Sequence, residues 1–158
     1  KQDNLQEDDE DCLHLINHIK HNPTKILDIG SGNGFPGIIV AIQKPKLKID
    51  LAEKQSKKAH FLRSVISKLN IPNATAIQKN IANNSDERYD LVVARAVAAT
   101  EKILQMTSKI LLPQAKYLLM KGTTSKTKTE TENIKLSYQI HAYTLSDKER
   151  CILEIFAP

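Results

Sequence analysis

From residue 24 onward, short apolar runs rich in β-branched residues alternate with longer segments whose apolar positions recur every three or four residues. The short runs predict buried strands, and the longer segments predict amphipathic helices. This alternation is typical of βαβ units on a mostly parallel sheet. The predicted strands are residues 25–29, 47–53, 74–78, 89–94 and 115–121, and the predicted helices are residues 35–43, 56–69 and 98–111.

The pattern changes after the fifth predicted strand. Residues 122–132 are mostly Thr, Ser, Lys and Glu without an apolar face, so we expect a mobile loop that enters a weak helix. Residues 137–145 and 150–156 alternate again, and the four residues between them suit a hairpin. The sequence therefore predicts an α/β fold with a seven-stranded, mostly parallel sheet and a C-terminal antiparallel hairpin. This is the order of a Rossmann-like methyltransferase sheet, not of a dehydrogenase with six parallel strands.

The 158 residues suffice for one domain of ordinary size, so we expect a single domain over residues 1–158. Residues 1–23 form an acidic, partly helical segment, with a helix expected at about residues 9–21 that packs outside the sheet. Residues 1–11 carry a net charge of −5, which leaves +10 on the rest of the chain. A basic body favours polyanions such as RNA, although lysines that only cover solvent-facing surfaces would give the same charge.

Several classes of protein are disfavoured by the sequence. The longest apolar stretch, residues 38–42, is too short to cross a bilayer, so no membrane insertion is expected. Cys12 and Cys151 lie far apart without metal-ligand spacing, which predicts reduced thiols in a cytoplasmic protein. His14, His18 and His21 could share a helical face, but the glutamate of a zinc-protease helix is missing, so no metal site is predicted.

A glycine-rich loop carries the clearest chemical signal. Residues 28–37 read Asp-Ile-Gly-Ser-Gly-Asn-Gly-Phe-Pro-Gly between the first predicted strand and the first helix. Open α/β sheets bind ligands at this carboxyl edge. Glycines let a ligand lie against the backbone, while the helix N-terminus presents unpaired N–H groups. We therefore predict a cofactor site that includes Gly30, Ser31, Gly32 and Gly34.

The charges near this loop narrow the choice of cofactor. Residues 32–37 match the dinucleotide pattern, and Glu53 follows at about the spacing of a ribose-binding acid. Asp28 would be unfavourable beside a pyrophosphate but favourable beside an ammonium group. S-adenosylmethionine carries an ammonium and a sulfonium and no phosphate, so it is preferred to NAD. Glu53 would accept both ribose hydroxyls, and Phe35 would contact the nucleoside.

Four blocks of sequence, in order, resemble one known family. They are the glycine loop, residues 53–62 (Glu-Lys-Gln-Ser-Lys-Lys-Ala-His-Phe-Leu), residues 94–98 (Ala-Arg-Ala-Val-Ala) and residues 119–122 (Leu-Met-Lys-Gly). Over about residues 25–122 the chain resembles the ribosomal RNA small subunit methyltransferase G family. The resemblance implies a cytoplasmic, Rossmann-like class I methyltransferase that uses S-adenosyl-L-methionine. Its expected product is 7-methylguanosine at one guanine of small-subunit (16S) ribosomal RNA.

The resemblance also assigns roles by matched position. It implies that Gly30 and Phe35 line the cofactor pocket, that Ile81 and Ala82 face the adenine, and that Arg95 lies between cofactor and substrate. Arg95 is the candidate catalytic residue, because its planar donor fork suits a phosphate or a guanine edge. Guanine N7 exposes a lone pair, so the enzyme mainly aligns the reactants and needs no general base.

The expected macromolecular partner is small-subunit ribosomal RNA or an assembling 30S particle, bound by a monomer without a membrane. The cations that we expect to contact RNA phosphates are Lys54, Lys58, Arg63, Lys121 and Lys128. Two alternatives stay open at this point, namely a small-molecule methyltransferase and a cofactor-binding protein without turnover. The match is weakest at residues 12–18, a degraded version of the family's His-Ile-x-Asp-Ser-like segment.

Overall fold

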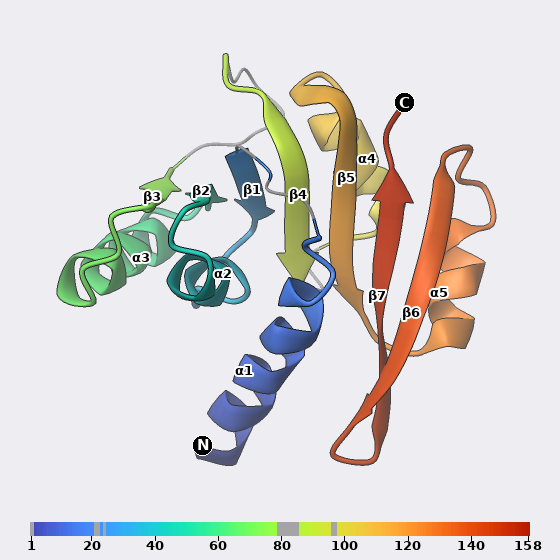
Figure 1. Cartoon of the computed structure of the whole chain (residues 1–158), viewed down its shortest axis with the longest axis horizontal. Helices are drawn as coiled ribbons and strands as arrows, with labels where there is room; N and C mark the ends of the chain where they lie inside the picture. The colour runs from blue at the N-terminus through green and yellow to red at the C-terminus, as the bar shows by residue number, and fades with distance from the viewer. Residues whose placement is uncertain (1, 21–22, 24, 79–85, 96–97) are drawn as a thin grey trace.

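The structure, a computed structural model, describes residues 2–20, 23, 25–78, 86–95 and 98–158. One twisted sheet forms the middle layer, and helices cover both of its faces (Figure 1). Within the described residues the sheet has seven strands in the order β3-β2-β1-β4-β5-β7-β6. Their bounds are β1 Lys25–Ile29, β2 Lys48–Ala52, β3 Ala74–Ile77, β4 Tyr89–Arg95, β5 Leu111–Lys121, β6 Ser137–Leu145 and β7 Lys148–Phe156.

The sheet confirms the predicted fold class. Strands β1 to β5 pair in parallel, whereas β7 lies antiparallel between β5 and β6. The hairpin from β6 to β7 turns over only two residues, Ser146 and Asp147, which have φ of +49° and +61°. Two central residues with positive φ match the right-handed twist of the strands, so β7 begins at Lys148, earlier than the predicted residue 150.

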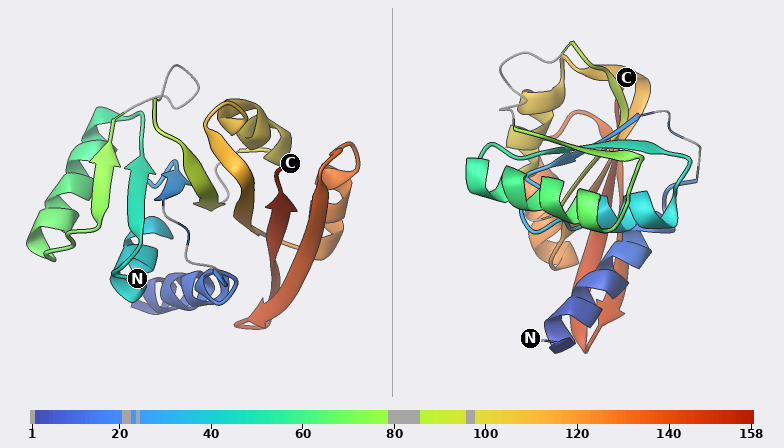
Figure 2. Two further views of the ribbon diagram at one scale, coloured as in Figure 1. Left: turned by 45° about the horizontal axis from the view of Figure 1, so that its top comes forward. Right: turned by 90° about the vertical axis from the view of Figure 1, so that its left-hand side faces the viewer.

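Alternating strand residues build two cores, one on each face of the sheet. Ile26, Leu91 and Ile152 pack under α1 (Gln2–Ile16), α2 (Gly37–Gln43) and α3 (Ser56–Lys68). Leu27 and Val92 belong to the opposite core, under α4 (Thr100–Thr107) and near α5 (Thr124–Thr131). Figure 2 shows α4 and α5 on one side of the sheet and α1 on the other. None of the helices in the described part of the chain is long and apolar enough to cross a membrane.

Several predicted boundaries were wrong. The helix expected at residues 98–111 ends at Thr107, and β5 already begins at Leu111, opposite Tyr89. The register then shifts before Leu91, and Gln114 has a φ of +63°, so the start of β5 is irregular and accommodates Pro113. The N-terminal helix covers residues 2–16 instead of 9–21, and the helix expected from residue 35 begins at residue 37.

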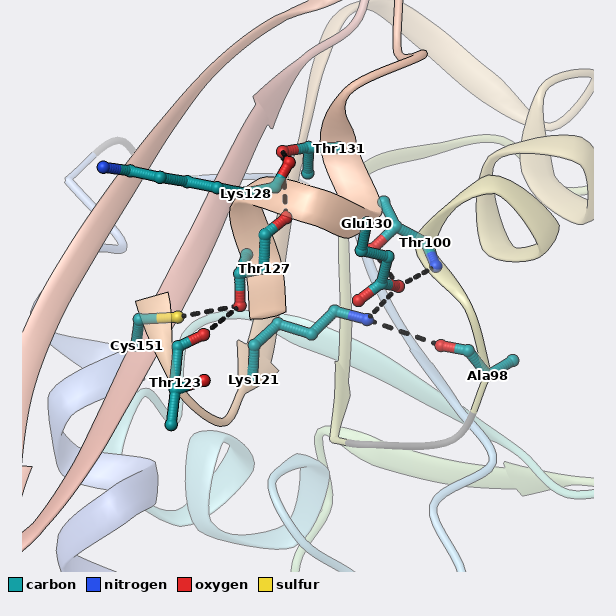
Figure 3. Close-up of polar contacts among 9 residues, drawn as sticks. All are labelled: Ala98, Thr100, Lys121, Thr123, Thr127, Lys128, Glu130, Thr131 and Cys151. Carbon is teal, nitrogen blue, oxygen red and sulfur yellow. Dashed lines mark hydrogen bonds and ion pairs between the residues drawn. The ribbon is translucent and has the colours of Figure 1, made fainter. Parts of the chain in front are cut away.

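The segment predicted as a mobile loop that enters a weak helix is helical over residues 124–131, the helix α5, so the helix is confirmed and only its extent was underestimated. The Thr123 side chain caps it by accepting the Lys126 N–H at 3.3 Å. Thr127 and Thr131 are buried, and each donates its hydroxyl to a carbonyl one turn earlier at 2.9 Å (Figure 3). The helix therefore buries satisfied hydroxyls where the sequence offered no apolar face.

Candidate cofactor and substrate site

The glycine loop joins the end of β1 to the start of α2 at the carboxyl edge of the sheet. Gly30, Gly32 and Gly34 have φ of +66°, +49° and +98°, a conformation that residues with side chains rarely adopt. The Gly30 N–H donates to the Ala52 carbonyl at 2.9 Å, which ties the loop to the end of β2. Ser31 is buried and its hydroxyl donates to the Asp28 carbonyl at 3.4 Å. These two hydrogen bonds fix the loop to the ends of β1 and β2.

Glu53 follows β2 directly and its carboxylate is aimed at this loop. One oxygen, Oε2, accepts the Gly32 N–H at 3.2 Å, and the other, Oε1, accepts the Gln55 N–H at 3.1 Å. The residue is only 6% exposed, so these two bonds fix the orientation of the carboxylate. The structure therefore brings together the predicted ribose acid and the predicted cofactor loop.

Asp28 lies near the end of β1, beside the glycine loop, as the sequence predicts. Its carboxyl group is completely buried, and Oδ2 accepts the Gly37 N–H at 2.8 Å. Its Oδ1 has no hydrogen-bond partner among the described residues. Burial raises the pKa of Asp28 to about 8. In this structure Asp28 holds the start of α2 through the Gly37 N–H.

Arg95 lies at the carboxyl end of β4, between the glycine loop and α1. Its guanidinium carbon is 5.3 Å from the centroid of the Phe35 ring, so it contacts the loop through a cation–π interaction. On the other side, Nη1 donates to Asp8 Oδ1 at 2.8 Å. The side chain is 25% exposed, which leaves part of its donor fork open to a ligand.

A cavity of about 260 Å³ opens beside Arg95, between α1 and the β6–β7 hairpin. Arg95 and Met120 contribute from the strand ends, Asp11 from α1, and Tyr143 and Arg150 from the hairpin. The Asp11 carboxylate accepts hydrogen bonds from both Tyr143 and Arg150. Sequence reasoning missed these hairpin residues because they belong to no motif.

The predicted RNA-binding cations are divided over the two faces of the sheet. Lys54, Lys58 and Arg63 are exposed at and along α3, whereas Lys128 is exposed on α5. Lys121 is the exception, because its side chain is only 9% exposed and its ammonium lies 2.9 Å from Glu130 Oε1. Figure 3 shows Lys121 directed at Glu130, while Lys128 points away from this cluster. Lys121 therefore joins β5 to α5, and its charge is paired with Glu130 in this structure.

Other predicted positions have simpler outcomes. Ile81 and Ala82 lie outside the described residues. Both cysteines are buried and free, and burial raises the pKa of Cys12 to about 12, which makes its thiol unreactive. His14 stacks on Tyr143 with ring centroids 4.0 Å apart, and His18 stacks on His141 at 4.2 Å. These histidines thus attach the end of α1 to β6.

The sheet order, the reversed last strand and the glycine loop after β1 together define a class I methyltransferase fold. A methyltransferase from Aquifex aeolicus, described as dependent on S-adenosylmethionine, superposes with a TM-score of 0.73 at 13% identity, over 95% of this chain and 90% of that one. A magnesium protoporphyrin IX methyltransferase from Synechocystis, solved with bound S-adenosylmethionine, gives 0.68 at 15% identity, over 97% and 79%. At such low identities the likeness concerns the fold alone.

Within that class, the chain belongs to the ribosomal RNA small subunit methyltransferase G family, whose family model matches residues 6–152. A relative of that name from a Thermotoga species is 43% identical over 100 residues, covering 61% of this chain and 44% of the relative. Another, from Legionella pneumophila, is 34% identical over 148 residues, covering 92% and 69%. The chain spans about half the length of most of the curated relatives it matches.

Proposed function

We propose that this chain transfers a methyl group from S-adenosyl-L-methionine to N7 of one guanine in small-subunit ribosomal RNA. The relatives' names supply the substrate class, and the residues beside the glycine loop supply a site that suits the reaction. One observation carries the proposal. Arg95 contacts the loop through Phe35 and also lines the neighbouring cavity, so one side chain adjoins the sites proposed for methyl donor and methyl acceptor.

The residues that would hold the cofactor fit it in charge and hydrogen bonding. Ribose hydroxyls are donors, and the Glu53 carboxylate is an acceptor-only group that two backbone N–H bonds already hold in place. The positive φ of Gly30, Gly32 and Gly34 leaves bare backbone for the donor to lie against. Bound there, S-adenosylmethionine supplies an activated methyl group. Asp28 contributes by holding Gly37, and Ile81 and Ala82 remain proposed for the adenine.

The acceptor requires positioning and little acid–base chemistry. N7 of guanine already exposes a lone pair, so the protein mainly aligns this atom with the methyl group and excludes water. Arg95 has donors for a guanine edge or a neighbouring phosphate, and the cavity of about 260 Å³ gives room beside it. We assign Arg95 the positioning of the substrate. Lys54, Lys58, Arg63 and Lys128 contact phosphates in this proposal.

The proposal also covers the domain organisation, the oligomeric state, the cellular location and the form of the substrate. Residues 1–158 fold as one domain and act as a monomer in the cytoplasm. The substrate is small-subunit ribosomal RNA, either free or in an assembling 30S particle. The absence of acidic side chains from residues 54–69, which adjoin the site, supports a polyanionic substrate over a small metabolite.

Cofactor and substrate are tested separately. We expect calorimetry to show binding of S-adenosylmethionine and none of NAD, and we expect Glu53→Gln to weaken cofactor binding about tenfold or more, because a charge-assisted hydrogen bond contributes about 1.5–3 kcal/mol. Glu101→Gln, an exposed change of equal charge on α4, is the control. Tighter binding of NAD, or full cofactor affinity in Glu53→Gln, would overturn the cofactor site.

The transfer itself is measured with labelled cofactor on 30S particles and 16S RNA that lack the modification. We expect label in 7-methylguanosine at one position, and strongly reduced transfer by Arg95→Ala with nearly unchanged cofactor affinity. Arg95→Lys keeps the charge and loses the planar fork, so it should recover only part of the rate. Label in small metabolites alone, or a fully active Arg95→Ala, would contradict the proposal.

A further inference from the structure

Helix α3 exposes an aromatic ring that the fold does not use. Its sheet-facing residues are Ala59 and Leu62, both with 0% exposure, and they anchor the helix. Phe61, next to Leu62, is 49% exposed. Among the described residues it is not one of the side chains packed on either core. An aromatic side chain gains stability from burial, so a half-exposed ring outside the core leaves its π face available.

The segment that carries this ring has cationic side chains and no acidic ones. Residues 54–69 contain five lysines and arginines and no Asp or Glu. These cations are Lys54, Lys57, Lys58, Arg63 and Lys68, all of them exposed and without an ion pair to any described residue. Acid–base pairing on one helix face is the usual arrangement of a solvated helix, and it is absent from this sequence.

Helix geometry places the ring beside two of these charges. Residues three and four apart lie on the same side of a helix, so Lys57 and Lys58 stand one turn before Phe61. Helix α3 starts at Ser56, three residues after Glu53, and Phe61 lies about 8 Å along it at 1.5 Å per residue. Lys57 and Lys58 therefore lie in the first turn of α3, next to the proposed cofactor site, and Phe61 follows one turn later.

We infer that Phe61 is a stacking platform for an unpaired RNA base, with Lys57 and Lys58 on the adjacent phosphates. This rests on the proposed function, and it adds that the substrate is single-stranded where it crosses α3. Single-stranded RNA combines the two groups that this surface complements, a chain of negative charges and planar bases with free π faces. A duplex offers only its phosphates here, because its bases are stacked on one another.

The test uses the full chain and a single-stranded oligonucleotide of 16S sequence, with a fully paired duplex of equal length beside it. Stacking on an aromatic ring contributes about 1–3 kcal/mol per base, so Phe61→Ala and Phe61→Leu should raise the Kd for the single strand roughly 5- to 150-fold. Phe61→Tyr keeps the ring and should bind like the wild type. Leu69→Ala removes a side chain at the end of the same helix that is 57% exposed, and it should change nothing.

Salt dependence separates stacking from charge. Phe61→Ala should leave the slope of log Kd against log salt unchanged, whereas Lys58→Ala should reduce its magnitude by about one. The unfolding midpoint, the affinity for S-adenosylmethionine and the affinity for duplex should stay the same in Phe61→Ala. These readouts distinguish an RNA contact from a structural role.

Three results would overturn the inference. One is an unchanged single-strand Kd in Phe61→Ala and Phe61→Leu while the wild type binds and methylates RNA, which leaves the proposed function intact. A second is an equal loss of affinity for duplex, and a third is a lowered unfolding midpoint that accounts for the loss. If the wild type binds no RNA at all, the proposed function falls, and this inference falls with it.

Discussion

Arg95 at the end of β4 and Asp8 in α1 form an ion pair, with 2.8 Å between Nη1 and Oδ1, although 87 residues separate them in the sequence. Arg150 likewise forms an ion pair with Asp11 of α1, and its Nη2 lies 3.8 Å from Glu7 Oε2. The acidic helix α1 therefore places carboxylates on two arginines that line the cavity proposed for the substrate. A phosphate or guanine edge that uses Arg95 competes with Asp8 for the same donors.

The first prediction follows from this competition. Asp8→Asn frees Arg95 and should lower the Kd for RNA by up to about fivefold, because partly exposed ion pairs contribute about 0.2–1 kcal/mol. Asp9→Asn is the matched control, since it removes the same charge from an exposed position on the same helix. The measurement is RNA binding at moderate salt. Equal gains in the two variants would show a general charge effect and no competition at Arg95.

The second prediction concerns Glu130, which joins three elements. Its Oε1 accepts hydrogen bonds from the Thr100 N–H, from the Thr100 hydroxyl at 2.7 Å and from the Lys121 ammonium at 2.9 Å (Figure 3). Burial alone would raise the pKa of Glu130, but these donors together outweigh it and hold the pKa below its ordinary value. The carboxylate thus stabilises the start of α4 and neutralises the nearly buried Lys121.

Glu130→Gln should therefore lower the free energy of unfolding at pH 7 by about 1–3 kcal/mol. A depressed folded-state pKa gives stability that is present above about pH 4.3 and is lost as the pH falls through the folded value. The difference in free energy of unfolding between wild type and variant should accordingly disappear toward pH 3. Urea unfolding at both pH values measures it, with the exposed Glu132→Gln as control. A gap of the same size at pH 3 would contradict the role of the charge.

The third prediction tests the close approach at the start of α2. A methyl group on Gly37 would collide with Asp28 Oδ2 and Leu51 Cδ2, whereas one on Gly122 has nothing within 4 Å. Gly37→Ala should lower the free energy of unfolding by about 1–3 kcal/mol, and it should weaken cofactor binding because α2 and the loop must shift. Gly122→Ala should leave stability unchanged. If both variants had the same free energy of unfolding, the loop would accommodate the added methyl group without loss of stability, and the prediction would be wrong.

The sequence predicts the features that local residue patterns specify, and it does not predict those that depend on tertiary contacts. Strand β4 and the glycine loop were predictable, because a local apolar run and a local cluster of glycines specify them. For helix α5 the sequence predicted only a weak helix after a mobile loop, since Glu130 reaching Thr100 is a tertiary contact that the sequence does not reveal. The partner of Arg95 was equally inaccessible, because it depends on where α1 crosses the strand ends.

Asp28 shows the same limit within the site itself. The sequence places a carboxyl group beside the loop, but only the structure shows that this group turns inward to the Gly37 N–H. Lys121 is similar, because a lysine after a strand looks free until Glu130 is placed next to it. Residue types and positions were predictable here, and the direction of each side chain was not.

The inward turn of Asp28 leads to the last prediction, a pH dependence of stability. Burial raises the pKa of this carboxyl group to about 8, far above its ordinary value of about 3.9. Between these two values the folded state keeps a proton that the unfolded state has lost. The contribution of Asp28 to stability is therefore complete below about pH 4 and falls as the pH rises toward 8.

Asp28→Asn is neutral at every pH, and its side-chain oxygen still accepts the Gly37 N–H. Its free energy of unfolding should therefore exceed that of the wild type at pH 9, by an amount on the order of a few kcal/mol since one pKa unit corresponds to about 1.4 kcal/mol. The advantage should shrink steadily toward pH 5. Urea unfolding at pH 5, 7 and 9 measures this, with Asp9→Asn as the exposed control. Parallel pH profiles for Asp28→Asn and wild type would show that the buried carboxyl group does not hold its proton.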